Sequence, residues 1–341
     1  MDTVRYTREF VSLALGKFLA KGVLPCSVIA REPPIIAAFA HDFFKNLPVI
    51  LKALPSGRRV YALLKLGYER ESPEQLKEEQ DNYLRLKNIR DDIECTYLCN
   101  SPKEVENLEG CDMRAVLCNH NTFIDETRFP ILPRSTKLYD AVYLSRLTPC
   151  KRHHLASKIK QLLVIGGYLD YEKDYALKEM ATIPHAMWLI KVRGFTVHQH
   201  FASAHIGLCL SDREGAMYAS TEYLLCGLPV VSTPNIGGRD VFFDPEYVRT
   251  VDPTPEAVAK GVYELIDKEI DPFYIRGATL KKIQVHRENY VSLLESIFEK
   301  EKKPFDREKA WDTYFFHKLG LRTTVSPYVS WKKLLRRTSF E

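Results

Sequence analysis

The second half of the sequence alternates short apolar runs with longer helix-like segments, and this alternation constrains the fold most strongly. The apolar runs occupy 140–145, 161–167, 204–211 and 229–233. Runs of this length, bounded by glycine, proline or polar residues, are typical of buried strands. Because parallel strands need a crossover connection, usually a helix, the pattern predicts a parallel, doubly wound α/β sheet.

Helices are expected between and after these strands. The candidate segments are 151–160, 175–191 on both sides of Pro184, 218–226, 254–270, a helix near 283–303 that ends at Pro304, and 306–320. Gly227 and Pro229 follow the segment 218–226 and form a typical helix stop. The segment 254–270 opens with Thr-Pro-Glu, a typical capped helix start.

The first half of the sequence is less regular but still has α/β character. Strand-like cores lie within 33–44 and 57–67, a further strand is expected at 115–119, and 72–93 is predicted as a polar helix. The segment 121–138 carries two prolines in "FPILP" and few apolar pairs. We interpret it as the linker between two domains.

The length of 341 residues agrees with two domains, and the contents of 45% hydrophobic and 27% charged residues are ordinary for globular proteins. We expect an N-terminal α/β domain over 1–135, a C-terminal α/β domain over 136–303, and a helix with a basic tail over 304–341.

Composition limits the function classes. A net charge of +5 suits an anionic ligand or an acidic membrane surface and does not require nucleic acid. The eight cysteines are scattered, mostly in apolar runs, which indicates reduced thiols of a cytoplasmic protein, and their spacing predicts no metal site. No run of 18 apolar residues occurs, so no transmembrane helix is expected.

The stretch "SDREGAMYASTEYLLCGLPVVST" at 211–233 contains two carboxylates, Glu214 and Glu222, separated by seven residues. Within one continuous helix they would lie about 12 Å apart along the axis. We therefore place Glu214 in the loop after the strand 204–211 and Glu222 in the helix that follows. Both would line the cleft at the carboxyl ends of the strands, beside a helix N-terminus suited to phosphate. A nucleotide sugar has the matching layout of ribose, diphosphate and hexose.

This stretch resembles the E-x7-E signature of retaining glycosyltransferases with the GT-B fold, of the family-4 type known as glycosyl transferases group 1. Four more segments resemble elements of that family in the same order: "NTFIDETRF", "VYLSRLTPCKRHHLASKI", "LLVIGG" and "STPNIGGRDVFFD". The resemblance spans roughly residues 92–268. It implies two Rossmann-like domains that face each other across a cleft. The domain over 1–135 would be a shortened acceptor-side domain, and the domain over 136–303 would bind the nucleotide sugar.

The resemblance also implies an activity and roles for individual residues. A sugar would pass from a nucleotide-sugar donor to a hydroxyl of a glycan, lipid-linked or small-molecule acceptor, with retained anomeric configuration. Arg146 and Lys151 would hold the donor diphosphate, Glu214 the donor sugar and Glu222 the ribose. The remaining donor-binding residues would be Gly167, Gly215, Ala216, Met217 and Tyr218.

The chain contains no D-x-D triplet of the kind that binds metal in glycosyltransferases of the other common fold. This absence favours a metal-independent hexosyltransferase that uses no cofactor beyond its donor. UDP is favoured over GDP as the nucleotide. Base recognition by backbone atoms leaves little trace in a sequence, so the sugar, the base and the acceptor stay open.

The sequence also departs from the family pattern. No Gly-Gly pair occurs before Gly166, and the segment "YALLKLGYE" lacks the histidine that many members have after a strand of the N-terminal domain. His41 and His120 are the remaining candidates for the acceptor side, although a lone histidine is more often structural.

Two other functions of the chain, and two roles for its C-terminal segment, stay open. The chain could be a non-catalytic, nucleotide-sugar-binding partner subunit of a glycosyltransferase complex. A Rossmann enzyme of another kind is disfavoured, because no G-x-G-x-x-G follows a strand. The basic segment 331–340 either binds an anionic membrane, which would place the protein peripherally on an inner membrane face, or docks back on the body.

Overall fold

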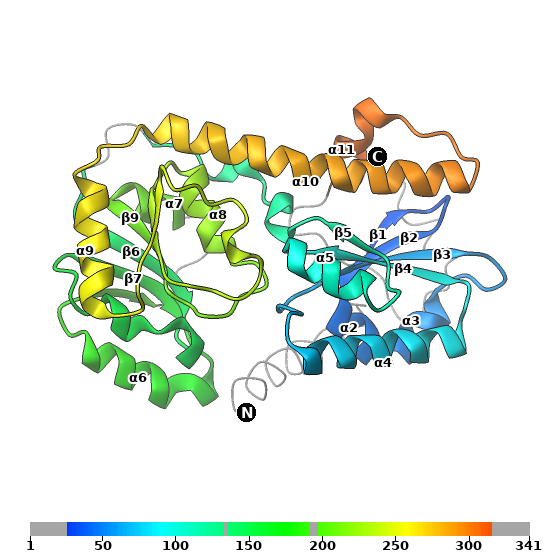
Figure 1. Cartoon of the computed structure of the whole chain (residues 1–341), viewed down its shortest axis with the longest axis horizontal. Helices are drawn as coiled ribbons and strands as arrows, with labels where there is room; N and C mark the ends of the chain where they lie inside the picture. Colours follow the sequence, from blue (N-terminus) through cyan, green and yellow to red (C-terminus); the bar gives the residue numbers. More distant parts are fainter. Residues whose placement is uncertain (1–25, 133–135, 191–196, 316–341) are drawn as a thin grey trace. The chain divides into compact units, whose positions relative to one another are not determined.

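The structure is a computed structural model that describes residues 26–132, 136–190 and 197–315 (Figure 1). The chain forms two compact units, one made of Met1–Phe123 with Val285–Glu341 and the other of Ile124–Gln284. These limits differ from the domain borders expected at 135/136 and 303/304. The helix α10, Pro272–Lys300, explains much of the difference, because Tyr290, Leu293 and Leu294 of its second half pack into the core of the first unit.

The first unit contains a five-stranded sheet in the order β1-β2-β3-β4-β5. The strands are β1 Cys26–Ala30, β2 Ile35–Phe39, β3 Val60–Lys65, β4 Ile93–Cys99 and β5 Ala115–Leu117. β2 to β5 are parallel, and β1 lies antiparallel to β2 at the edge. The carboxyl ends of four strands therefore meet at one edge of this sheet.

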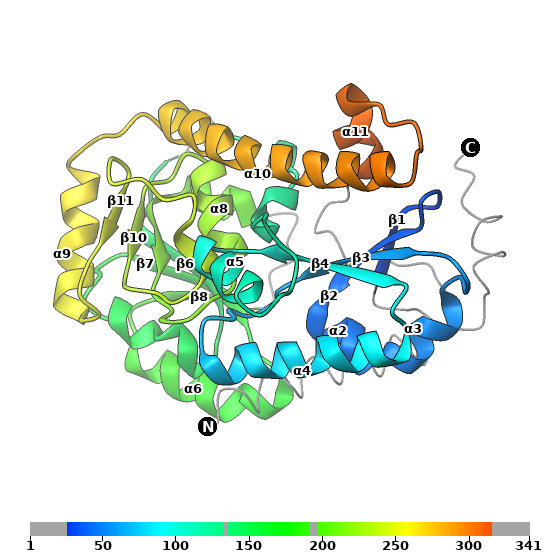
Figure 2. The ribbon, with the colours of Figure 1, turned by 45° about the vertical axis from the view of Figure 1, so that its right-hand side comes forward.

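Helices cover both faces of the first sheet (Figure 2). They are α2 Ala40–Lys45, α3 Leu47–Ala53, α4 Pro73–Ile89, α5 Pro102–Glu109, the second half of α10, and α11 Arg307–Tyr314. The side chains of β2 alternate between two cores, as the two-residue period of a strand requires. Ile36 packs with residues of α2 and α3, whereas Ile35 packs with residues of α10.

The second unit contains a six-stranded sheet in the order β11-β10-β9-β6-β7-β8, with every described pairing parallel. The strands are β6 Tyr139–Arg146, β7 Leu162–Gly167, β8 Met187–Ile190, β9 Ala204–Cys209, β10 Val230–Ser232 and β11 Val248–Thr250. The four strands expected from the sequence are confirmed as β6, β7, β9 and β10. The prediction of a parallel, doubly wound sheet is therefore confirmed.

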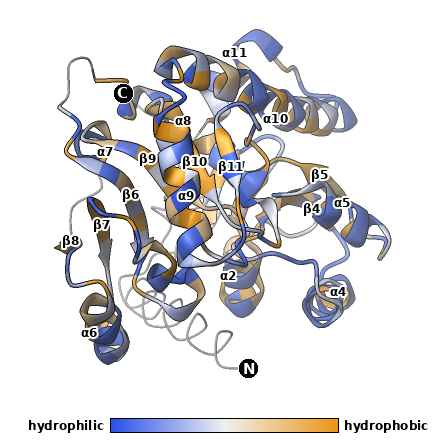
Figure 3. Ribbon diagram, turned by 60° about the vertical axis from the view of Figure 1, so that its left-hand side comes forward, coloured by the Kyte–Doolittle hydropathy of each residue, from blue (hydrophilic) through white to orange (hydrophobic). Residues whose placement is uncertain are grey.

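The helices of this unit are α6 Lys173–Thr182, α7 Val197–Ala202, α8 Tyr218–Leu225, α9 Pro255–Ile266 and the first half of α10. Figure 1 shows α6 and α9 on one side of the sheet and α7 and α8 on the other. The strand β10 is strongly hydrophobic in Figure 3, as expected for a strand covered on both faces.

Two expectations for local structure were wrong, and a third was right except for the end of its helix. The segment 151–160 forms no α-helix but two short 3-10 turns, Pro149–Lys151 and His153–Ala156, separated by Arg152 in the left-handed conformation at φ 49°. The segment 175–191 leaves its helix at Thr182 and continues as the strand β8. The polar helix expected over 72–93 ends at Ile89, and Ile93 starts β4, a strand that the sequence analysis did not identify.

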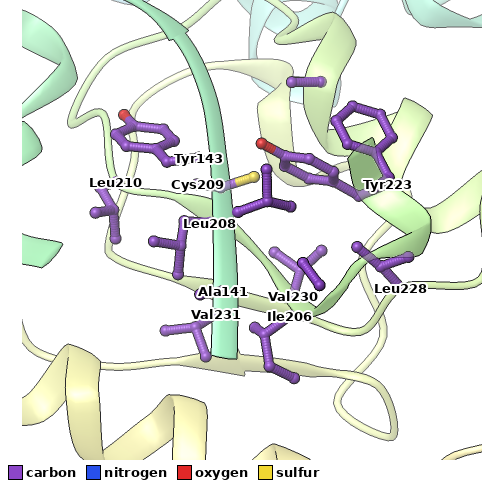
Figure 4. Packing of buried hydrophobic residues seen from close by; sticks show 14 of the residues in the cluster. Ala141, Tyr143, Ile206, Leu208, Cys209, Leu210, Tyr223, Leu228, Val230 and Val231 are labelled. Atoms are coloured by element: carbon purple, nitrogen blue, oxygen red, sulfur yellow. The ribbon is translucent and has the colours of Figure 1, made fainter. Parts of the chain in front are cut away.

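The helix α8 lies close to the sheet and ends as expected. A Cβ atom on Gly207 of β9 would lie 2.5 Å from the ring of Tyr223 of α8, so glycine permits this approach. Figure 4 shows Tyr223 beside Cys209 and Val230 in the same core. Gly227, at φ 75°, donates to the carbonyl of Leu224, and Leu228 donates to that of Tyr223. This pair of hydrogen bonds is a Schellman motif, which ends a helix at a left-handed glycine.

The described residues include no helix that is both long and apolar enough to cross a bilayer. The basic segment 331–340, predicted either to bind a membrane or to dock on the body, lies outside the described residues.

Candidate functional site

The candidate site lies at the carboxyl ends of two neighbouring strands in the second unit. β6 lies between β7 and β9, and the chain runs from β6 to β7 in one direction but from β9 to β10 in the other. The point between β6 and β9 is therefore a topological switch point, where doubly wound sheets bind ligands.

Two predicted site residues meet at this point. Lys151 follows β6, Glu214 follows β9, and their side chains form an ion pair. Each side chain is only 16% exposed, so the pair is largely shielded from water. The structure thus brings together a cation and a carboxylate that are far apart in the sequence.

Arg146, the other predicted cation, is the last residue of β6 and contacts a carboxylate of its own. Its Nε lies 3.3 Å from Oε1 of Glu172, whose side chain is only 3% exposed. The backbone N–H of Leu169 donates to the second oxygen of Glu172 at 2.9 Å. Glu172 therefore holds the guanidinium of Arg146 at the strand end, and the sequence analysis missed it because it belongs to no recognised motif.

The loop that carries Glu214 is fixed by a short ladder of backbone hydrogen bonds. Ile236 donates to the carbonyl of Asp212 at 2.9 Å and accepts from the N–H of Glu214 at 3.0 Å. Gly238 donates to the carbonyl of Gly215 at 2.8 Å. Gly237 adopts φ 107° and ψ −169°, a conformation essentially restricted to glycine, which explains the first glycine of the Gly-Gly pair in this turn.

The remaining donor-binding candidates lie around the start of α8. Gly215 and Ala216 precede the helix, Met217 is its N-cap residue and Tyr218 its first residue. Glu222 lies one turn further and is 7% exposed. Tyr218 and Glu222 share a helix face at i, i+4, and burial together with the charge of Glu222 raises the pKa of Tyr218.

Gly167 is the last residue of β7, and its carbonyl accepts from Leu147 at 2.9 Å. A Cβ atom at this position would meet no atom within 4 Å, so packing within the chain does not require glycine here. The structure places Gly167 at the same edge of the sheet as Arg146 and leaves open space beside it.

The turn that carries Lys151 rests on a buried polar cluster. The hydroxyl of Tyr143 donates to the carbonyl of Lys151 at 2.6 Å. Behind it, Ser145 Oγ and His153 Nε2 share a hydrogen bond of 2.8 Å, and His153 is fully buried. Burial and the nearby charge of Lys151 lower the pKa of His153 to about 3, so this imidazole is neutral at physiological pH.

The two histidines predicted for the acceptor side both follow strands of the first sheet. His41 lies in α2 directly after β2, and His120 lies in the turn after β5. His120 is 3% exposed and its backbone N–H donates to Asn100 Oδ1 at 3.1 Å. The ring of His120 also packs edge-on against that of Phe39, the last residue of β2, with 6.1 Å between the ring centroids, so His120 lies near the strand end that His41 follows.

Within residues 26–132, 136–190 and 197–315, no group of three His, Cys, Asp or Glu side chains could hold a metal ion. Every described cysteine is a free thiol.

Comparison with known proteins finds a family similar to most of the second unit. Residues 144–268 match the family described as glycosyl transferases group 1. No curated protein matches the chain.

Three solved structures resemble most of the chain. HepE of Anabaena, in complex with UDP, has a TM-score of 0.57 at 17% identity, with 77% of this chain and 78% of that chain covered. A variant of TarM from S. aureus, in complex with fondaparinux, alpha-GlcNAc-glycerol and UDP, has 0.53 at 14%, with 82% and 54% covered.

Sucrose-phosphate synthase from Thermosynechococcus elongatus has a TM-score of 0.52 at 16% identity, with 78% of this chain and 74% of that chain covered. Identities this low establish the fold alone. The chain thus has the GT-B fold of two Rossmann-like domains, and its residues 144–268 are similar to the glycosyl transferases group 1.

Proposed function

We propose that the chain transfers a hexose from a UDP-sugar to a hydroxyl acceptor, with retained anomeric configuration and without a metal ion. The observation that carries this proposal is the ion pair of Lys151 and Glu214 at the switch point of the second sheet. A cation for the leaving diphosphate and a carboxylate for the sugar then lie side by side, and Arg146 is the last residue of β6, the strand that Lys151 follows.

The proposed chemistry needs charge stabilisation at two places. As the glycosidic bond breaks, negative charge grows on the diphosphate and positive charge on the anomeric carbon. Lys151 and Arg146 would stabilise the first, and Glu214 the second. In a retaining reaction the leaving diphosphate can accept the acceptor proton on the same face, so no separate side-chain base is required.

The nucleoside would bind further along the same loop and helix. Glu222, buried in the second turn of α8, would accept hydrogen bonds from the ribose hydroxyls. Residues 215–218 would surround the phosphates at the N-terminus of this helix. UDP is the favoured nucleotide, since the similar structures of HepE and of the TarM variant were solved with UDP.

The acceptor would bind to the first unit, where His41 and His120 are the candidate contacts. The acceptors that fit are glycans, lipid-linked glycans or small hydroxyl compounds, as in polysaccharide or glycolipid synthesis. The basic segment 331–340 would hold the protein to an anionic membrane, and sedimentation with anionic against neutral vesicles tests this.

The direct test is a panel of UDP-, GDP-, ADP- and CMP-sugars, measured for thermal stabilisation and for slow donor hydrolysis. We expect UDP-sugars to stabilise the protein and to be hydrolysed to UDP. Stabilisation without turnover over a broad acceptor panel would instead favour the non-catalytic partner subunit. No stabilisation by any member of the panel would contradict both functions.

A further inference from the structure

Two arginines with no assigned role lie beneath the site. Arg239 follows the Gly-Gly turn and is fully buried, and Arg152 directly follows Lys151. A buried arginine is rare and must be compensated by hydrogen bonds, so the partners of such a residue indicate its role.

Arg239 holds the ends of two strands. Its Nη1 donates to the carbonyls of Cys209 at 3.1 Å and Ser211 at 2.5 Å, where the chain leaves β9. Its Nη2 donates to Ser232 Oγ at 2.7 Å and the Thr233 carbonyl at 2.6 Å, where the chain leaves β10. Asp240 balances the charge of Arg239, because its Oδ1 accepts from Nε at 2.6 Å and its Oδ2 accepts from Nη2 at 3.1 Å.

Arg152 holds the same two strand ends through different atoms. Its Nε donates to the carbonyl of Leu210 at 2.6 Å, and its Nη2 donates to Thr233 Oγ1 at 2.8 Å. The carbonyls of 209, 210 and 211 alternate in direction along the extended chain. One arginine therefore takes the carbonyls of 209 and 211, and the other takes the carbonyl between them.

We propose that Arg152 and Arg239 are positioning residues that clamp the exit of β9 and thereby set the facing geometry of Lys151 and Glu214. This inference rests on the proposed function. Arg152 is joined covalently to Lys151, and Arg239 fixes the chain three residues before Glu214. The carbonyl of Arg239 also accepts from Ser220 Oγ at 3.3 Å, which ties the clamp to the first turn of α8.

Two further observations agree with this assignment. Arg152 keeps a left-handed backbone at φ 49°, which is unfavourable for a residue with a side chain and needs compensating contacts. Burial alone would lower the pKa of Arg239, but the hydrogen bonds and charge of Asp240, with a contribution from Glu214, raise it. The guanidinium of Arg239 is therefore charged over the working pH range, whereas burial lowers the pKa of Arg152 below its ordinary value.

The test separates positioning from simple stability by a double-mutant cycle. Lysine at 239 keeps the charge but cannot span both strand ends. We expect Arg239→Lys to lower single-turnover sugar transfer about 10- to 100-fold, because small misplacement of reacting groups is costly, while the Kd for UDP changes less than about threefold. In a Glu214→Gln background the same substitution should cost less than about threefold, since its effect passes through Glu214.

Arg152→Gly relieves the backbone conformation but removes the contacts. We expect it to raise the Kd for UDP about tenfold, because Lys151 loses its anchor. Hydrogen exchange of the peptide 209–217 should quicken in both variants. Arg249→Lys is the matched control, an exposed arginine on β11 of the same sheet, and should change none of these quantities.

If Arg239→Lys does not fold, Ser232→Ala tests the same contact more gently and should shift transfer and exchange in the same direction. Equal losses in the wild-type and Glu214→Gln backgrounds, or unchanged exchange of 209–217, would overturn the clamp. If the wild-type chain turns over no donor, the proposed function fails. The exchange measurement then still decides whether the arginines fix this loop.

Discussion

At the residue scale, Lys151 already contacts the carboxylate of Glu214. A diphosphate that binds Lys151 must therefore either share this lysine with Glu214 or displace the carboxylate of Glu214 from it. A charge-assisted contact contributes about 1.5–3 kcal/mol, roughly 10- to 150-fold in affinity. We therefore expect Lys151→Ala and Arg146→Ala each to weaken donor binding by a factor in this range. Lys158→Ala is the control, because this lysine is 61% exposed. Wild-type UDP affinity in both site variants, measured by calorimetry, would show that these cations do not hold the diphosphate.

The two glutamates should respond differently to substitution. Glu214→Gln removes a charge close to the reacting carbon, so we expect turnover to fall about 10²–10³-fold with UDP affinity changed by less than about threefold. Glu222→Ala should raise the Kd for UDP, because ribose contacts act equally in the ground and transition states. Single-turnover rates and UDP titrations of both variants separate these roles. A parallel fall of activity and UDP affinity in Glu214→Gln would make this residue a structural support of the loop.

At the element scale, the sequence predicted buried parallel strands well and irregular connections poorly. Strands covered on both faces are almost continuously apolar, so their sequences are easy to recognise. This is why the sequence predicted β6, β7, β9 and β10. β4 was missed because its first residue, Ile93, was assigned to the preceding helix and the mixed run "ECTYLC" shows no clear period.

The contacts of Arg152 and Arg239 could not be predicted from the sequence, for a different reason. Arg152 and Arg239 donate mainly to backbone carbonyls, which leave no mark in a sequence. Arginines beside glycine or lysine are indistinguishable from surface cations until their neighbours are known. Lys151 and Glu214 were recognised from motif resemblance, but their contact depends on the strand order, which places β6 beside β9.

The turn after β6 should be sensitive to acid because it buries a neutral histidine. The pKa of His153 falls from 6.5 to about 3 in the fold, so between these values the unfolded state binds a proton that the folded state does not. Stability should therefore fall as the pH drops through this window, by up to about 1.4 kcal/mol per pH unit. His153→Gln keeps a partner for Ser145 and should reduce the acid-induced loss.

Urea unfolding of the wild type and His153→Gln at pH 7.5 and 4.5 measures this difference. The stability gap between the two proteins should change by roughly 2–3 kcal/mol over this range, in favour of the variant at low pH. His205 and Asp240 in the same unit, and His286, Glu104 and Asp42 in the other, also have shifted pKa values, but both proteins contain them, so their contributions cancel in the comparison. His154→Gln, which alters the exposed neighbour, is the control, and an equal change in it would contradict the assignment to His153.

At the scale of the whole molecule, the predicted donor machinery lies in one compact unit. Arg146, Lys151, Glu214 and Glu222 all belong to Ile124–Gln284, whereas His41 and His120 belong to the other unit. UDP binding should therefore depend on the second unit, and acceptor use on the first. His41→Ala and His120→Ala are accordingly informative only in transfer assays, with UDP affinity as their internal control.

The last prediction concerns the charge that neutralises the donor. The protein carries a net charge of +5, and Arg146 and Lys151 lie at the strand ends where the diphosphate is expected. If these side chains provide the positive charge, UDP should bind equally well, within about threefold, with magnesium or with EDTA. Binding should also weaken as salt is added, since screening lowers the attraction between charges. Calorimetric titrations with UDP in both buffers and at two salt concentrations test this, with Lys151→Ala as the variant whose salt dependence should be smaller. A loss of affinity beyond about tenfold on chelation would show that a divalent ion shares the diphosphate with these residues, and the metal-independent mechanism would then be wrong.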